Sequence, residues 1–104
     1  MILATADTIE GREIVETIGI VRGNAARARG VGYDITAGIR NIFGGAVPEY
    51  SNLMTQSRDE ATQMMIEAAE ASGADAIVAV RYTTSTIAAG VSEILAFGTA
   101  VKLR

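Results

Sequence analysis

The long amphipathic stretch over residues 48–72 constrains the fold of this chain more than any other feature. Small and apolar side chains recur along it at helical spacing, and Pro48 and Gly73 suit its start and its end. A helix of about 24 residues is about 36 Å long. Strands of about ten to eleven residues reach a similar length. The sequence therefore predicts a long helix lying across a sheet.

Four segments have the β-branched or alternating character of strands. They are residues 2–6, 13–23, 75–86 and 92–103. The alternation of the second breaks at Gly19, which predicts a bulge or burial on both faces. The residues that follow it, 24–33, are small and glycine-rich and are interpreted as a connection.

A short helix is predicted over residues 35–43. Asp34 suits its N-cap, and the paired glycines Gly44 and Gly45 would end it. We therefore expect an α+β fold, with a two-layer antiparallel sheet of about four strands, one long helix and one short helix. The length of the chain indicates a single domain spanning residues 1–104.

Neither histidine nor cysteine occurs among the 104 residues. Their absence removes the commonest general base, thiol nucleophiles, disulfides and the softest metal ligands. The net charge of −3 argues against a nucleic-acid partner. No apolar run approaches the ~20 residues that span a bilayer, and no secretory leader is visible. We expect a cytoplasmic protein that is not an enzyme, has no cofactor and binds neither nucleic acid nor membrane.

Both faces of the last two predicted strands are apolar or small. One helix covers one face of a sheet, and a second apolar face would be a large exposed patch on so small a chain. The short helix and the loops could hide this face, or a second copy of the chain could. We predict that copies associate through the face formed by Ile77, Ala79, Ile94, Ala96 and Ala100.

Charge is unevenly distributed along the chain. Residues 20–45 carry four arginines against Asp34, and residues 46–75 carry six acidic residues against Arg58. Complementary patches of this kind suit head-to-tail contacts between identical subunits. They suit pairing within one chain equally well.

Polar residues near the starts of the two predicted helices are candidates for a small-ligand site. They are Asp34, Arg40, Tyr50 and Arg58. Gly30 and Gly32 precede the short helix, but a dinucleotide-binding loop needs three glycines, and a plain connection is the alternative. Asp34 would otherwise be a helix cap, and Tyr50 a packed ring.

Three carboxylates share one outer face of the long helix, namely Glu60, Glu67 and Glu70. Carboxylates bind hard cations such as Mg²⁺ or Ca²⁺, so these residues are candidate metal ligands. A solvated helix face is the alternative.

The order and spacing of several short segments resemble the YbjQ-like family over essentially the whole chain. They are residues 32–45 (GYDITAGIRNIFGG), Tyr50, residues 57–61 (SRDEA), residues 73–78 (GADAIV) and residues 98–101 (GTAV). The resemblance implies a small α+β domain similar in fold to dodecin subunits, assembly into homopentameric rings, and no established activity. Ala46 stands where the family commonly has arginine.

The family is also labelled heavy-metal-binding. Without cysteine or histidine, the chain offers a poor set of ligands for zinc, cadmium or mercury. We therefore expect a homo-oligomeric, pentameric ring that acts as a structural or binding module. The alternative is a metal-ion or small-anion binding protein with sites at subunit junctions. A hydrolase or transferase would need carboxylates of raised pKa in a cleft, and the sequence has no close paired-acid motif.

Overall fold

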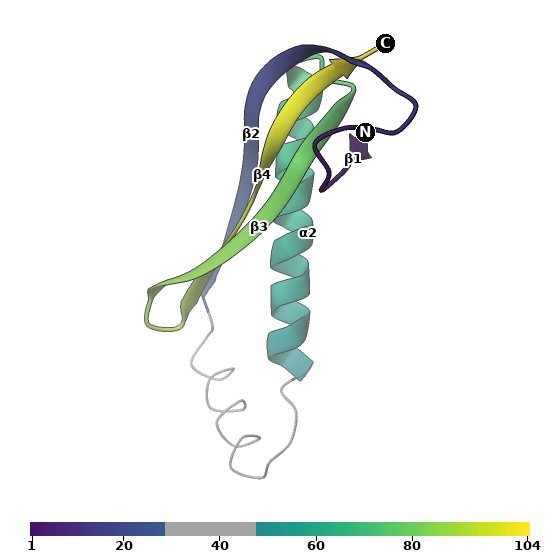
Figure 1. The fold of residues 1–104 in the computed structure, drawn as a ribbon. Coiled ribbons are helices and arrows are strands. Elements are labelled where there is room, and N and C mark those ends of the chain that lie inside the picture. Colours follow the sequence, from purple (N-terminus) through teal and green to yellow (C-terminus); the bar gives the residue numbers. More distant parts are fainter. Residues whose placement is uncertain (29–47) are drawn as a thin grey trace.

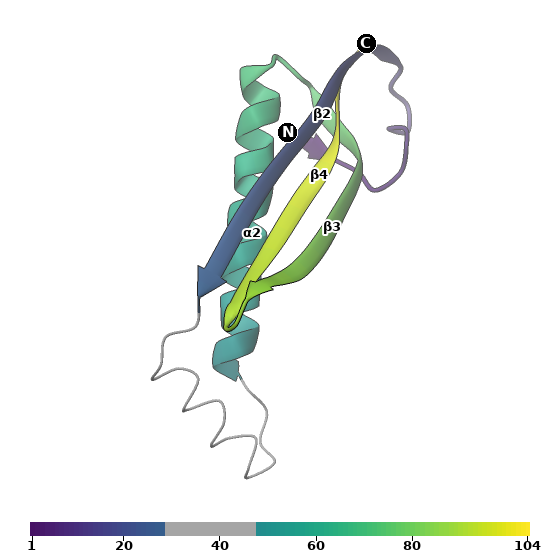
Figure 2. The ribbon, with the colours of Figure 1, turned by 90° about the vertical axis from the view of Figure 1, so that its left-hand side faces the viewer.

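The structure, a computed structural model, describes residues 1–28 and 48–104. Its elements are β1 (Ile2–Leu3), β2 (Ile14–Ala28), α2 (Pro48–Ala71), β3 (Ala76–Ala88) and β4 (Val91–Leu103). The four strands form one sheet in the order β1-β3-β4-β2, and α2 lies along one face of it (Figures 1 and 2). The predicted α+β fold with a long helix is confirmed. The short helix predicted over residues 35–43 lies outside the described residues.

The sheet is mixed, although an antiparallel sheet was predicted. β1 runs parallel to β3, with Ile2 opposite Ala76 and Leu3 opposite Ile77. β4 pairs antiparallel with both β2 and β3. After β1 the chain crosses from the β3 edge of the sheet to the opposite edge before it forms β2. No hairpin turn therefore joins β1 to its neighbour, and the pairing is free to be parallel.

The end of α2 is defined by backbone hydrogen bonds. Gly73 has a φ of 82°. Its N–H donates to the carbonyl oxygen of Glu70, and the N–H of Ala74 donates to that of Ala69, both at 3.0 Å. These two bonds form a Schellman motif, which satisfies the last carbonyl groups of the helix. The predicted stop at Gly73 is confirmed.

β2 is longer than predicted and contains the predicted bulge. Its register against β4 shifts between Thr17 and Gly19. Beyond Gly23 the strand continues to Ala28, which pairs with Val91. The small residues there have weak strand propensity, but β4 supplies a continuous row of hydrogen-bond partners, and such tertiary pairing overrides local preference.

A second bulge interrupts β3. The register against β4 shifts between Val78 and Arg81, so that Ala79 and Val80 oppose the single residue Gly98. Ala79 has a φ of 53°, in the region that favours glycine. The N–H groups of Ala79 and Val80 donate to carbonyl oxygens of the segment after β1, at 2.9 and 3.0 Å.

The β3 bulge reverses the alternation of side chains. A regular strand would place Val78, Val80 and Tyr82 on one face. Val78 instead packs on the side away from α2, whereas Val80 belongs to the core beneath α2. Tyr82 pairs with the buried Ala96 and so also projects towards α2. Arg81 consequently projects from the open side of the sheet.

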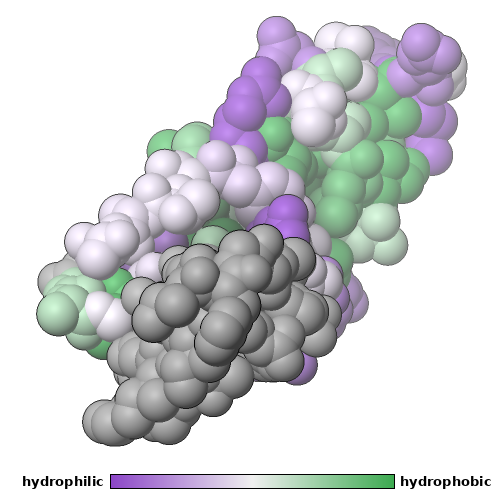
Figure 3. All heavy atoms as spheres, turned by 90° about the horizontal axis from the view of Figure 1, so that it is seen from below, coloured by the Kyte–Doolittle hydropathy of each residue, from purple (hydrophilic) through white to green (hydrophobic). Residues whose placement is uncertain are grey.

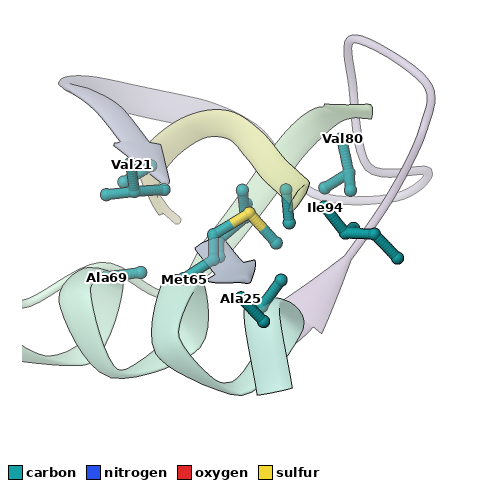
Figure 4. Close-up of a cluster of buried hydrophobic side chains, with 10 residues drawn as sticks. Val21, Ala25, Met65, Ala69, Val80 and Ile94 are labelled. Carbon is teal, nitrogen blue, oxygen red and sulfur yellow. The ribbon is translucent and has the colours of Figure 1, made fainter. Parts of the chain in front are cut away.

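The main core lies between α2 and the sheet (Figure 4). Its buried members are mostly small or aliphatic: Val21, Ala25, Ala61, Met65, Ala69, Ile77, Val80, Ile94, Ala96 and Ala100. A Cβ atom on Gly23 would stand 2.1 Å from the carbonyl oxygen of Ala61. The small side chains therefore let the backbones of α2 and β2 approach closely.

The covered face of the sheet is the reverse of the prediction. Ile77, Ile94, Ala96 and Ala100 were predicted on the uncovered face, yet all four are buried in the core beneath α2. Ala79, the fifth predicted interface residue, lies in the β3 bulge. Because both faces of these strands are apolar, alternation identifies two faces but not the one that α2 covers.

A smaller cluster packs on the opposite face, at one end of the sheet. Ala76, Val78, Val101 and Leu103 are buried there, and Ile9 and Ile14 pack against them. The segment between β1 and β2, drawn as a loop in Figure 1, thus covers this end of the face away from α2. The rest of that face is called the open face below.

Candidate functional site

The predicted ligand cluster is only partly described. Asp34 and Arg40 lie outside the described residues, and so does the side chain of Tyr50, whose backbone forms part of the first turn of α2. Arg58 is exposed on α2, and its guanidinium donates to the hydroxyl of Thr55 at 3.3 Å. The structure therefore places Arg58 beside its own helix and leaves the assembly of the four residues untested.

The predicted carboxylate stripe is exposed along α2. Glu67 accepts a hydrogen bond of 3.5 Å from the side chain of Gln63, one turn earlier. Glu60 and Glu70 are also exposed. Among the described residues, no three or more acidic side chains gather closely enough to hold a metal ion. The structure does not bring these three carboxylates together.

Heavy-metal binding would need ligands that this sequence lacks. Zinc and softer metals select thiolate and imidazole groups, and the chain contains no cysteine and no histidine. Carboxylate, hydroxyl, carbonyl and thioether groups remain. This set of donors does not fit a heavy-metal centre within one chain.

An apolar groove that sequence reasoning missed lies beside α2, at the outer edge of the sheet. It has a volume of about 170 Å³ and is lined by Leu3, Ala4, Thr5, Val80 and Tyr82. These five residues are called the β1–β3 groove. The hydroxyl of Tyr82 lies 2.8 Å from that of Thr62 on α2, which fixes the ring at the rim. Hydrophobic side chains gather along one side of the molecule in Figure 3.

The groove exists because α2 is narrower than the sheet. The helix packs chiefly on β2 and β4 and hardly touches β3. Leu3 and Tyr82 consequently remain 37% and 46% exposed. The strand predicted over residues 2–6 is present as β1, but neither its parallel pairing with β3 nor the β3 bulge gives a recognisable sequence pattern, so the groove could not be predicted.

A row of three side chains crosses the open face. Arg22 on β2 and Arg81 on β3 both pair with Phe97 on β4, the central strand of the three. Directly opposite residues project from the same face. Phe97 projects away from α2, because its neighbour Ala96 is buried beneath the helix. An arginine thus lies on each neighbouring strand directly opposite one phenylalanine.

No helix in the described part of the chain is long and apolar enough to cross a membrane.

Known proteins resemble this chain over its full length. The "UPF0145 protein" of Halorubrum lacusprofundi is 57% identical over 104 residues and is covered completely, as is this chain. "UPF0145 protein VP1283" of Vibrio parahaemolyticus is 53% identical, with 99% of this chain and 98% of the relative covered. These names state no activity.

A solved structure supports the fold. A crystal structure of a protein of unknown function from Pediococcus pentosaceus, assigned to the DUF74 family, matches with a TM-score of 0.72 at 18% identity. The match covers 100% of this chain and 98% of that one. The YbjQ family model, described as "Putative heavy-metal-binding", matches residues 1–104. Together with relatives that are more than half identical, this match shows that the chain belongs to the YbjQ-like family.

Proposed function

We propose that this chain is a structural or binding module that assembles with copies of itself into a closed ring, with the pentamer implied by the family resemblance as the expected size. The observation that carries the proposal is the presence of two apolar surfaces at opposite edges of one sheet. The order β1-β3-β4-β2 puts the β1–β3 groove at one edge and β2 at the other.

The surface on β2 is centred on Ile20, which is 81% exposed; Val15, earlier on the same strand, is 46% exposed. Ile20 pairs with Thr99 on the side away from α2. An isoleucine so exposed gains roughly 1.5–3 kcal/mol when it is fully buried. Leu3, in the groove at the other edge, is 37% exposed and gains about a third of that amount, so both surfaces favour contact with a partner.

Two different surfaces at opposite edges suit a head-to-tail contact. In such a contact, each copy presents its groove to one neighbour and its β2 surface to the other. Repetition of this contact closes into a ring when the rotation between neighbours is suitable. A two-fold dimer would instead use one self-complementary surface and leave the other exposed.

The assembly is tested by light scattering after size-exclusion chromatography at micromolar concentration. A ring of five chains of 10.9 kDa has a mass of about 55 kDa. The variants Leu3→Asp and Ile20→Asp each place a charge in one surface and should reduce the mass to that of one chain. Gln56→Glu, at an exposed position of α2, is the matched control and should keep the ring. A wild-type monomer would refute the proposal.

A mixture of the two charge variants tests the head-to-tail arrangement. Leu3→Asp retains its β2 surface, and Ile20→Asp retains its groove, so one of each should combine into a dimer of about 22 kDa. Two copies of the same variant should not combine. If the mixture stays monomeric while the wild type forms rings, the two surfaces do not meet each other.

A further inference from the structure

The Arg22–Phe97–Arg81 row on the open face has the composition of a ligand site. Adjacent strands lie about 4.8 Å apart, so Arg22 and Arg81 stand about 10 Å apart across the sheet with the ring of Phe97 between them. The long side chain of Arg22 can reach an anionic group placed over the ring, whereas the guanidinium of Arg81 is directed to the outer side of β3 and supplies positive charge there.

Arg81 is held in position by the segment after β1. Its Nη1 atom donates to the carbonyl oxygens of Thr5 and Val80 at 2.8 and 2.9 Å. The remaining guanidinium N–H groups stay available to a ligand, since arginine has five donors. Arg22 is exposed, and no partner for it is found among the described residues.

The surroundings of the row extend the site along β4. The next row towards the β3–β4 turn consists of Asn24, Leu95 and Thr83. Leu95 and Phe97 are half-buried and give an apolar floor, whereas Asn24 and Thr83 are exposed polar groups at its sides. Glu93 lies four residues from Phe97, about 13 Å along the strand, so the row itself keeps a positive charge.

We propose that this row binds a small molecule that combines a planar aromatic ring with a phosphate or carboxylate group. The ring would stack on Phe97, and the anionic group would accept charge-assisted hydrogen bonds from Arg22 and be attracted by the charge of Arg81. A single aromatic ring and two cations fit a ligand of mononucleotide size. A long polyanion is disfavoured by the net charge of −3. The row borders both surfaces proposed for ring assembly, because Arg22 lies two residues from Ile20 on β2 and Arg81 contacts Thr5 of the groove.

The proposal is tested by isothermal titration calorimetry with four probes. ADP and 1-naphthyl phosphate carry both a ring and an anionic group, whereas adenosine and pyrophosphate carry one each. We expect at least one of the first two to bind with a Kd below 1 mM, at least ten-fold more tightly than either half-ligand. If neither binds, or if pyrophosphate alone binds equally well, the proposal is wrong.

Substitutions locate the site. Arg22→Gln should weaken binding at least ten-fold, and Phe97→Leu at least three-fold. Arg104→Gln removes an exposed guanidinium just beyond β4, where it pairs with Glu13 at 2.9 Å, and should have no effect. Backbone amide shifts in NMR spectra of the wild type should move at Arg22, Asn24, Leu95 and Phe97. If Arg22→Gln and Phe97→Leu bind as tightly as the wild type, or if the amide shifts are confined to other elements, the assignment is wrong. The mass of each sample is measured by light scattering in parallel. A loss of ligand binding is thereby distinguished from a failure to form the ring.

Discussion

At the scale of single residues, Gly23 determines how closely the helix approaches the sheet. A Cβ atom there would lie 2.1 Å from the carbonyl oxygen of Ala61 and 2.6 Å from the backbone nitrogen of Met65. Backbone atoms of a helix cannot yield as a flexible side chain can. Gly23→Ala should therefore lower the free energy of unfolding by about 3 kcal/mol, the upper end of overpacking costs.

Urea denaturation measures this loss, with Gly11→Ala as the comparison. Gly11 has a φ of 75° and open space around its Cα, so its substitution adds only conformational strain, about 1 kcal/mol. Equal losses in the two variants would show that the approach of α2 to β2 does not depend on Gly23.

Ala79 is the converse case, because its conformation suits glycine. An alanine at positive φ costs roughly 1–2 kcal/mol, and glycine adds about 0.5–1 kcal/mol of unfolded-state entropy. Ala79→Gly should leave stability unchanged or raise it by up to about 1 kcal/mol. Ala79→Val should lower it, because β-branched residues tolerate this region least. Thermal unfolding followed by circular dichroism distinguishes these outcomes, and a valine variant as stable as the wild type would contradict them.

At the scale of elements, one side chain fastens the start of β3 to the end of β4. The carboxylate of Asp75 accepts the N–H of Leu103 at 2.9 Å, and the N–H of Asp75 donates to the carbonyl oxygen of Val101 at the same distance. Asp75→Ala leaves the Leu103 N–H without its acceptor. We expect a loss of about 1–2 kcal/mol in the free energy of unfolding.

Asp75→Asn is the matched control, because its amide oxygen still accepts the hydrogen bond. It should retain at least half of the stability that the alanine variant loses, as measured by urea denaturation. If both variants lose the same amount, the negative charge matters more than the hydrogen bond.

Elements also show which parts of the fold could be predicted. α2 was predictable because its apolar stripe is long and its end carries a glycine in the required conformation. The covered face was not, since Ile94 and Leu95 are equally apolar although they point in opposite directions. The bulge at Ala79 leaves no trace in residue type, because alanine ordinarily has no need of positive φ. The β1–β3 groove and the Arg22–Phe97–Arg81 row both depend on the bulge, because it sets the sides on which Tyr82 and Arg81 project.

At the scale of the whole molecule, assembly through apolar contacts and assembly through charged patches should respond differently to added salt. The surfaces proposed for ring assembly, around Leu3 and Ile20, are apolar. Salt screens charge interactions but leaves apolar burial intact. The mass from light scattering should therefore be the same in 50 mM and in 1 M sodium chloride. A mass that falls with added salt would favour the charge asymmetry along the chain as the source of assembly.

The β3 bulge has a consequence for how this protein tolerates change. Two residues of β3 face one residue of β4 there, so the removal of either would restore a regular ladder. The side chains on both sides of the bulge would keep their faces, because Val78 would still pair with Thr99 and Arg81 with Phe97. A single-codon deletion in a regular part of β3 would instead shift the register by one residue and turn every side chain on one part of the strand to the other face. The spacing of this strand thus carries as much information as its composition, and at this bulge a lost residue preserves both faces.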